Sequence, residues 1–179
     1  MAMDLQRLEK NLFDNVLEAQ LKLGYEGRPM SLNYTSSSLK HLTGTDDIEK
    51  ALDEFAAQSV ERFGKLTFRS ISGGYCITVP TEGTAYVHEN SEKNSFMHRF
   101  IETVRSHTTI EKVLDVFREF SDDVEVTEMN NDEFQYLVYF RNGIPDDYRY
   151  CLADEEEIDG SHHITYHRFI AEDYDDLGF

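Results

Sequence analysis

The sequence predicts an α+β fold, in which N-terminal helices and a short hairpin pack on a C-terminal antiparallel β-meander. Through most of residues 1–120, apolar residues recur every three or four positions, which is the spacing of one helix face. From residue 123 onward, apolar and polar residues alternate in short runs separated by turn residues, which is typical of antiparallel strands. Helices that precede the strands, rather than alternating with them, favour the α+β class.

The first helix is predicted over residues 4–23 and ends at Gly24. Its apolar face consists of Leu5, Leu8, Leu12, Val16, Ala19 and Leu23. Residues 28–34 alternate weakly and predict a short strand, and residues 36–42 predict a short helix that ends at Gly44.

A longer helix is predicted to begin at Asp46, because Glu49 follows three residues later as in a capping box. Its apolar face is Ile48, Leu52, Phe55, Ala56, Val60 and Phe63. Gly64 is predicted to end it.

The period then changes to alternation. Residues 66–68 and 75–79 alternate on either side of the turn Ser72-Gly73-Gly74, which predicts a β-hairpin. Pro80 and Gly83 are predicted to end this hairpin.

Two further helices are predicted, over residues 96–104 and 110–120, the second opened by a capping box of Thr108 and Glu111. Their aromatic and Met stripes have helical spacing, so core packing explains them. Four strands follow, around residues 124–126, 134–140, 148–152 and 164–168. Since no linker-like stretch divides the chain, we expect one domain over residues 1–179, helix-rich in 1–120 and strand-rich and acidic in 121–179.

Charge is the one compositional extreme, with a formal net charge of −18. Residues 1–120 hold 18 Asp and Glu against 14 Lys and Arg, whereas residues 121–179 hold 17 against 3. Such a surface repels nucleic acid and anionic membranes, because attraction to either polyanion needs clustered Lys and Arg. It suits a basic protein partner or a cation, although acidic residues also serve simply to keep a protein in solution.

The two cysteines, Cys76 and Cys151, are too few and too far apart to predict a disulfide framework. The N-terminal stretch MAMDLQRLEKNLFDNV lacks the apolar region of a signal peptide, and no run of about 18 apolar residues occurs. We therefore expect a cytoplasmic location. Each cysteine lies in an alternating run, so we expect a sheet position rather than a reactive thiolate, which needs nearby positive charge.

The stretch SHHITYHRF carries His162, His163 and His167, ten or so residues after Cys151. In a strand, His163 and His167 point to one face and His162 to the other. Four residues span about 13 Å along a strand, whereas zinc ligands lie about 2 Å from the metal, so a mononuclear site is strained. A metal site of His163, His167 and Cys151 is the alternative to a strand whose solvated face carries histidines.

Other chemistry has little support in the sequence. The acidic run 154–160 lacks the ligand spacing of a calcium loop and predicts a solvated hairpin loop. Asp146 and Asp147 are neighbouring carboxylates that can serve acid–base chemistry, but after Pro145 they are equally typical of a turn. The sequence contains no nucleophile elbow and no phosphate-binding glycine motif.

The C-terminal stretches FQYLVYFRNGIPDDYRYCL, HHITYHRF and EDYDDLGF, together with LEKNLFDNVLEAQLKLGY near the N-terminus, carry a resemblance that covers nearly the whole chain. They resemble a family of proteins from gut Firmicutes bacteria that is described as a domain of unknown function. The resemblance implies a bacterial cytoplasmic protein, and it implies no activity, substrate or cofactor.

Two hypotheses about function follow. The first is a non-enzymatic interaction module whose acidic C-terminal sheet binds a basic protein, because tyrosines supply contact area and complementary charge speeds association. The residues predicted to contact that partner are Asp146, Asp147, Tyr148, Tyr150 and Tyr166, with Tyr136 and Tyr139 nearby. The alternative is a small metal-dependent hydrolase that uses the C-terminal histidines with Asp146 or Asp147. We expect no cofactor, and we prefer the interaction module because the charge asymmetry is a definite feature of the sequence.

Overall fold

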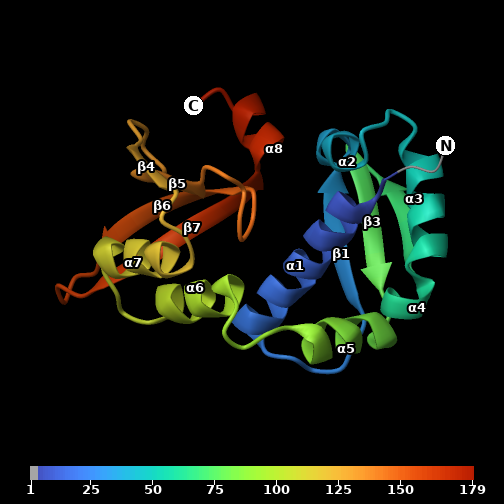
Figure 1. The fold of residues 1–179 in the computed structure, drawn as a ribbon, viewed down its shortest axis with the longest axis horizontal. Coiled ribbons are helices and arrows are strands. Elements are labelled where there is room, and N and C mark those ends of the chain that lie inside the picture. The colour runs from blue at the N-terminus through green and yellow to red at the C-terminus, as the bar shows by residue number, and fades with distance from the viewer. Residues whose placement is uncertain (1–3) are drawn as a thin grey trace. The chain divides into compact units, whose positions relative to one another are not determined.

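A computed structural model describes residues 4–179 (Figure 1). This part of the chain contains eight helices and two antiparallel sheets of three and four strands, so the predicted α+β class is confirmed. No helix in it is long and apolar enough to cross a membrane. The chain divides into two compact units, Met1–Ser91 and Glu92–Phe179, which are described in turn. The single domain expected over residues 1–179 stays a prediction.

The first unit consists of five helices and a three-stranded sheet in the order β1-β3-β2. Its helices are α1 (Gln6–Leu23), α2 (Ser36–Thr43), α3 (Ile48–Gln58), α4 (Val60–Phe63) and α5 (Thr81–Asn90). Its strands are β1 (Met30–Thr35), β2 (Thr67–Ile71) and β3 (Gly74–Val79). The predicted hairpin is β2–β3, and the predicted short strand joins it as β1, paired antiparallel with β3.

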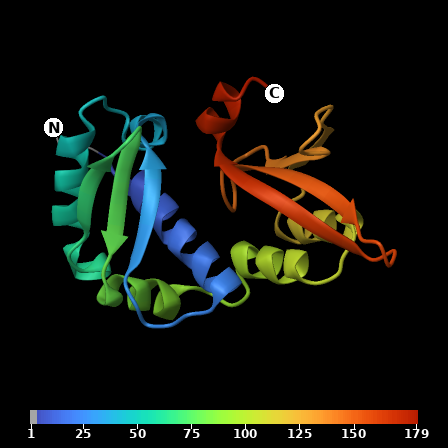
Figure 2. The ribbon, with the colours of Figure 1, turned by 180° about the vertical axis from the view of Figure 1, so that it is seen from behind.

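Helix α1 covers one face of this sheet. It lies in front of β1 in Figure 1, whereas the strands lie in front of it in the reverse view of Figure 2. Leu8, Leu12 and Val16 of α1 are fully buried, as their spacing predicts. The amide of Asn15 on α1 donates to the hydroxyl of Tyr34 on β1 at 2.9 Å, which fixes the helix against that face.

Two local predictions in this unit are wrong. The residue that caps α3 is Asp47 rather than Asp46, because its side chain accepts from the backbone N–H of Lys50. The predicted single helix up to Phe63 is divided at Ser59, whose buried hydroxyl donates to the carbonyl of Phe55.

Helix α5 was not expected, since Pro80 and Gly83 were predicted to mark the end of the hairpin. Pro80 instead stands at the N-cap, where its missing N–H costs no hydrogen bond, and Gly83 lies in the first turn. A Cβ at Gly83 would lie 2.4 Å from the carbonyl oxygen of Phe63. Glycine is therefore required here by the close approach of α5 to the end of α4, and not by a turn.

The second unit consists of three helices and the predicted meander, a sheet in the order β4-β5-β6-β7. Its helices are α6 (Phe96–Arg105), α7 (Ile110–Phe120) and α8 (Ala171–Asp176). Its strands are β4 (Val124–Glu128), β5 (Tyr136–Phe140), β6 (Tyr148–Glu156) and β7 (His162–Ile170). Figures 1 and 2 both show α6 and α7 on the same side of the sheet.

An aromatic core joins these two helices to the sheet. The ring of Phe100 on α6 contacts those of Tyr150 and Tyr166 with centroids 5.0 and 4.8 Å apart, and Phe117 on α7 contacts Phe140 at 5.3 Å. The sheet residues in these contacts, Phe140, Tyr150 and Tyr166, all have even numbers. We call the sheet face that carries them the inner face and the opposite face the outer face. The outer face has a smaller apolar cluster around Cys151, against which Phe169 and Tyr174 pack.

Three details of the second unit differ from the predictions. Thr109, and not Thr108, caps α7, and Thr108 is buried instead. The acidic C-terminal stretch forms α8 from Ala171 onward. Strand β6 continues to Glu156, so three of the seven residues of the expected loop 154–160 belong to the sheet.

Candidate functional site

The second unit holds most of the negative charge. Glu92–Phe179 contains 22 Asp and Glu against 8 Lys and Arg, a net charge of −14, whereas Met1–Ser91 contains 13 against 9, a net charge of −4. Residues 92–179 are all described, and Asp146 is the one carboxylate among them that is buried. The remaining carboxylates are therefore at least partly exposed and form the surface of this unit.

Five of the six arginines of this unit make ion pairs or ring contacts within it. Those that make ion pairs with carboxylates are Arg99 with Glu119, Arg118 with Asp115, and Arg141 with Asp123 and Glu125. The guanidinium groups of Arg149 and Arg168 lie over the rings of Tyr139 and Tyr148, 3.9 and 4.4 Å from the ring centroids. The excess of carboxylates consequently faces solvent without an equal number of cations, which gives the surface a negative potential.

Several carboxylates lie close together in the sequence of β4 and the residues that flank it. We call this segment, residues 121–133, the acidic margin. It contains six carboxylates and neither Lys nor Arg: Asp122, Asp123, Glu125, Glu128, Asp132 and Glu133. Arg141 of the loop after β5 is the cation that reaches it, through Asp123 and Glu125. Thr127 and Glu128 are exposed, and Val124 and Val126 are half-buried.

The tip of the β6–β7 hairpin is a second acidic region, and it holds two histidines. His162 Nδ1 lies 2.9 Å from Asp154 on the inner face, and this hydrogen bond raises the pKa of His162. His163, on the outer face, lies 2.6 Å from Glu157 and 3.3 Å from Glu155. The two histidines thus point to opposite faces, as the alternation of a strand predicts.

Asp146 and Tyr150 form a buried pair at the start of β6. The Tyr150 hydroxyl donates to Asp146 Oδ2 at 2.8 Å, and the backbone N–H of Tyr148 donates to Oδ1 at 3.2 Å. Burial, and then the neighbouring carboxylate, raise the pKa of Tyr150 well above its ordinary value. A phenol with a raised pKa stays a hydrogen-bond donor, so this pair holds the chain entering β6 in place.

The structure separates the residues that were predicted to contact a partner. Tyr148 and Tyr150 are buried on the inner face together with Asp146, and Tyr166 is half-buried against Phe100. Asp147 is exposed. The alternation of a single strand does not show which face of the sheet α6 and α7 cover. In this fold a partner at the surface would meet Asp147 and the exposed carboxylates rather than the rings of Tyr148 and Tyr150.

The residues of the alternative metal site are not brought together. His163 pairs across the sheet with Glu155, and His167 pairs with Cys151, so the two histidines stay four residues apart on one strand. Cys151 is fully buried in the outer-face cluster, and burial raises the pKa of its thiol to about 11. His167 stacks on Phe169 with ring centroids 4.2 Å apart. A neutral, buried thiol is a poor metal ligand and a poor nucleophile.

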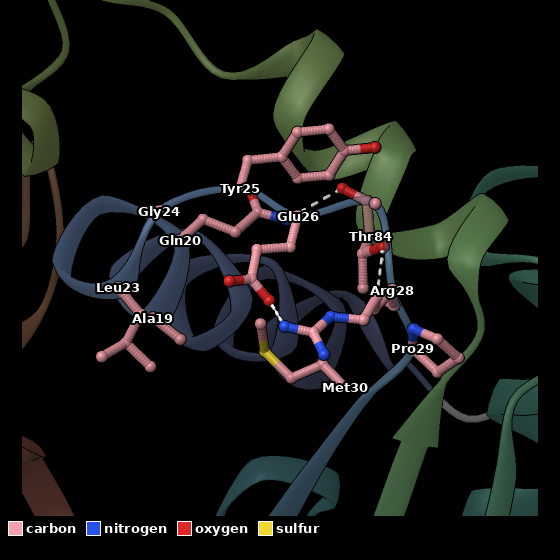
Figure 3. A pocket seen from close by; sticks show the side chains of 11 residues that line it. Ala19, Gln20, Leu23, Gly24, Tyr25, Glu26, Arg28, Pro29, Met30 and Thr84 are labelled. Atoms are coloured by element: carbon pink, nitrogen blue, oxygen red, sulfur yellow. Dashed lines mark hydrogen bonds and ion pairs between the residues drawn. The ribbon is translucent and has the colours of Figure 1, made fainter.

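The first unit contains a hollow of about 470 Å³ at the C-terminal end of α1, which the sequence did not reveal (Figure 3). The last turns of α1, the loop 24–30 and Thr84 of α5 line it. The side chain of Gln20 donates to the carbonyl of Thr84 at 2.9 Å, and the hydroxyl of Thr84 donates to the carbonyl of Arg28 at 2.9 Å. The first bond ties α1 to α5, and the second ties the loop to α5.

The polar groups of this hollow are largely committed to the fold. Arg28 is paired with Glu26, as Figure 3 shows, and the ring of Tyr25 stacks on that of His88 at 4.0 Å. The Oε1 atom of Gln20 is buried and has no hydrogen-bond partner within residues 4–179. The lining offers amide, hydroxyl and paired charges, and it brings no nucleophile together with a base.

A family model described as "Domain of unknown function, E. rectale Gene description (DUF3877)" matches residues 5–178. No curated protein and no solved structure matches the chain. The match therefore spans both units and adds no residue roles to those that the geometry suggests.

Proposed function

Because the chain belongs to this family of domains of unknown function, we propose its function from its physical properties: the second unit is a non-enzymatic module that binds a basic protein partner. The observation that supports this most is the net charge of −14 on residues 92–179, carried by surface carboxylates whose neighbouring arginines are already engaged. Such a surface attracts a basic protein over several ångströms, accelerates association and repels nucleic acid and anionic membranes.

The compartment that we propose is the bacterial cytoplasm. Cys76 and Cys151 are free and buried, which suits a reducing environment.

The first test is capture of a partner from a lysate of the host by the untagged protein at low salt, followed by elution with increasing salt. We expect a basic protein that is released as ionic strength rises, because screening shortens the reach of surface charges to about 8 Å at physiological ionic strength. Capture that is insensitive to salt would contradict the proposal.

Charge-neutralised variants make this test specific to the second unit. One variant replaces Glu128, Asp132 and Glu133 by their amides, and another does the same at Glu155, Glu156 and Glu157. The matched control neutralises Asp53, Glu54 and Glu61 of the first unit. We expect at least one of the first two variants to weaken capture while the control retains it, whereas equal losses in all three would indicate attraction by net charge alone.

A further inference from the structure

Strand β4 lies at one edge of the four-stranded sheet, and its hydrogen-bonding pattern shows which backbone groups face outward. The N–H of Arg141 donates to the carbonyl of Asp123, and the N–H of Met129 donates to the carbonyl of Gln135, at 2.9 and 2.8 Å. In an antiparallel ladder such bonded pairs alternate, so the odd-numbered residues of β4 bond to β5. The N–H and C=O groups of Val124, Val126 and Glu128 therefore point away from the sheet.

This edge lacks lysine and proline, two residues that commonly block the pairing of an exposed strand. The opposite edge, β7, carries Arg168, whereas β4 contains no cationic residue. Of the two edges of this sheet, β4 is thus the one open to a positively charged strand.

The side chains of β4 specify what such a strand would carry. Glu125 and Thr127 share the outer face, and Glu125 reaches Arg141. Val124 and Val126 lie on the inner face and are half-buried, so they leave apolar surface beside the edge. A complementary strand has Lys or Arg opposite the carboxylates of the acidic margin and β-branched residues beside the two valines.

We propose that β4 binds an extended, basic segment of a partner protein, which pairs with its outer edge and becomes a fifth strand of the sheet. This inference rests on the proposed function and gives it a mode of recognition. Backbone hydrogen bonds to Val124, Val126 and Glu128 supply part of the affinity, and the six carboxylates of residues 121–133 select a positively charged segment.

The test uses the whole protein and a synthetic peptide that alternates Lys with Val or Thr. Calorimetric titration at low salt is expected to show binding, and hydrogen exchange is expected to slow at the amides of Val124, Val126 and Glu128. A peptide of the same sequence with N-methylated amides at alternate residues keeps the charge but cannot complete the ladder. We expect it to bind at least about tenfold more weakly, which corresponds to the loss of one or two net hydrogen bonds.

A matched pair of protein variants tests the same edge. Val126→Pro removes an outward N–H without removing a bond to β5, and edge strands tolerate proline at such positions. His162→Pro makes the same change at the opposite edge. The N–H of Glu157 donates to the carbonyl of Ser161 at 2.7 Å, so Ser161 is bonded to β6 and the backbone of the next residue, His162, points outward. We expect Val126→Pro to weaken the peptide at least about tenfold and His162→Pro to leave its affinity unchanged.

The outcomes separate this inference from the proposed function. Equal affinity for the N-methylated peptide would overturn edge pairing, yet salt-sensitive capture of a basic partner would still support an acidic binding surface. If neither peptide binds at low salt, the inference is overturned as well. If capture from the lysate is insensitive to salt, the proposed function itself fails.

Discussion

Asp146 shows how a residue chosen for chemistry can have a structural role. Its position beside Asp147 suggested a carboxylate pair, but its side chain is buried and accepts hydrogen bonds from Tyr150 and from the backbone of Tyr148. A buried carboxylate is tolerated when donors surround it, and each missing donor then carries a high cost. Asp146 and Tyr150 are therefore expected to matter more for stability than for recognition.

Replacing Tyr150 by Phe is expected to lower the free energy of unfolding by about 1–3 kcal/mol, because a buried carboxylate loses a donor. Urea unfolding followed by circular dichroism measures the change. Tyr139→Phe, on the outer face of the same sheet, is the control and should change stability by less than about 0.5 kcal/mol. Equal effects of the two substitutions would show that the bond to Asp146 contributes nothing.

His162 is expected to make stability depend on pH. Its pKa in the folded protein is raised above the ordinary value of 6.5 by Asp154, so the folded protein holds this proton more tightly than the unfolded chain. The resulting stabilisation is fully present below pH 6.5 and is lost as the pH rises through the folded pKa.

Urea unfolding of the protein and of His162→Gln over this range tests the prediction. The difference in unfolding free energy should shrink as the pH rises, and a difference that is constant with pH would contradict it. In an NMR titration, His162 should titrate above the ordinary value and His98, whose pKa is lowered by burial, below it.

At the scale of elements, the sequence predicts the long periodic segments well. Helix α1, the β2–β3 hairpin and the meander appear where apolar spacing places them, because one buried face sets the period of each. The errors have local causes. The periodic helix is interrupted at Ser59, where α3 ends and α4 begins, and α5 follows Pro80 and Gly83, two residues that more often mark a turn.

The candidate site was less predictable than the fold. Alternation places Tyr148 and Tyr150 on one face of their strand, but only the register of β6 with β7 and the packing of α6 and α7 place them with Tyr166 on the inner face. The acidic excess of residues 121–179 is visible in the sequence, yet the location of the acidic margin on an open edge depends on strand order. The hollow at the end of α1 depends on hydrogen bonds between distant segments, and no local pattern records it.

Gly83→Ala is a direct test of how α5 packs. Helix propensity alone predicts a gain of about 1 kcal/mol, whereas a Cβ 2.4 Å from the carbonyl oxygen of Phe63 predicts overpacking that costs about 1–3 kcal/mol or more. Because the backbone of Phe63 cannot move as a side chain tip can, we expect a net loss of stability in thermal unfolding. Glu89→Ala, at an exposed position of the same helix, is the control, and a stabilised Gly83→Ala protein would contradict the packing.

At the scale of the whole molecule, the two compact units predict where the chain is most open to proteolysis. Lys93 is exposed and lies between the last residue of α5 and the first of α6, next to the division at Ser91. Limited digestion with a lysine-specific protease is expected to cut first after Lys93 and to yield two fragments that persist. A first cut elsewhere, or rapid loss of both fragments, would instead favour the single domain that the sequence suggests.

The open edge of β4 also has a consequence for self-association at high salt. When two copies of this strand approach each other, the carboxylates of residues 121–133 face each other, and their repulsion opposes pairing. High salt screens these charges, so the repulsion weakens while the outward backbone groups and the valines remain. The residues that we propose for attracting a partner are thus also the ones that protect the protein from self-assembly, and screening by salt weakens both properties at once.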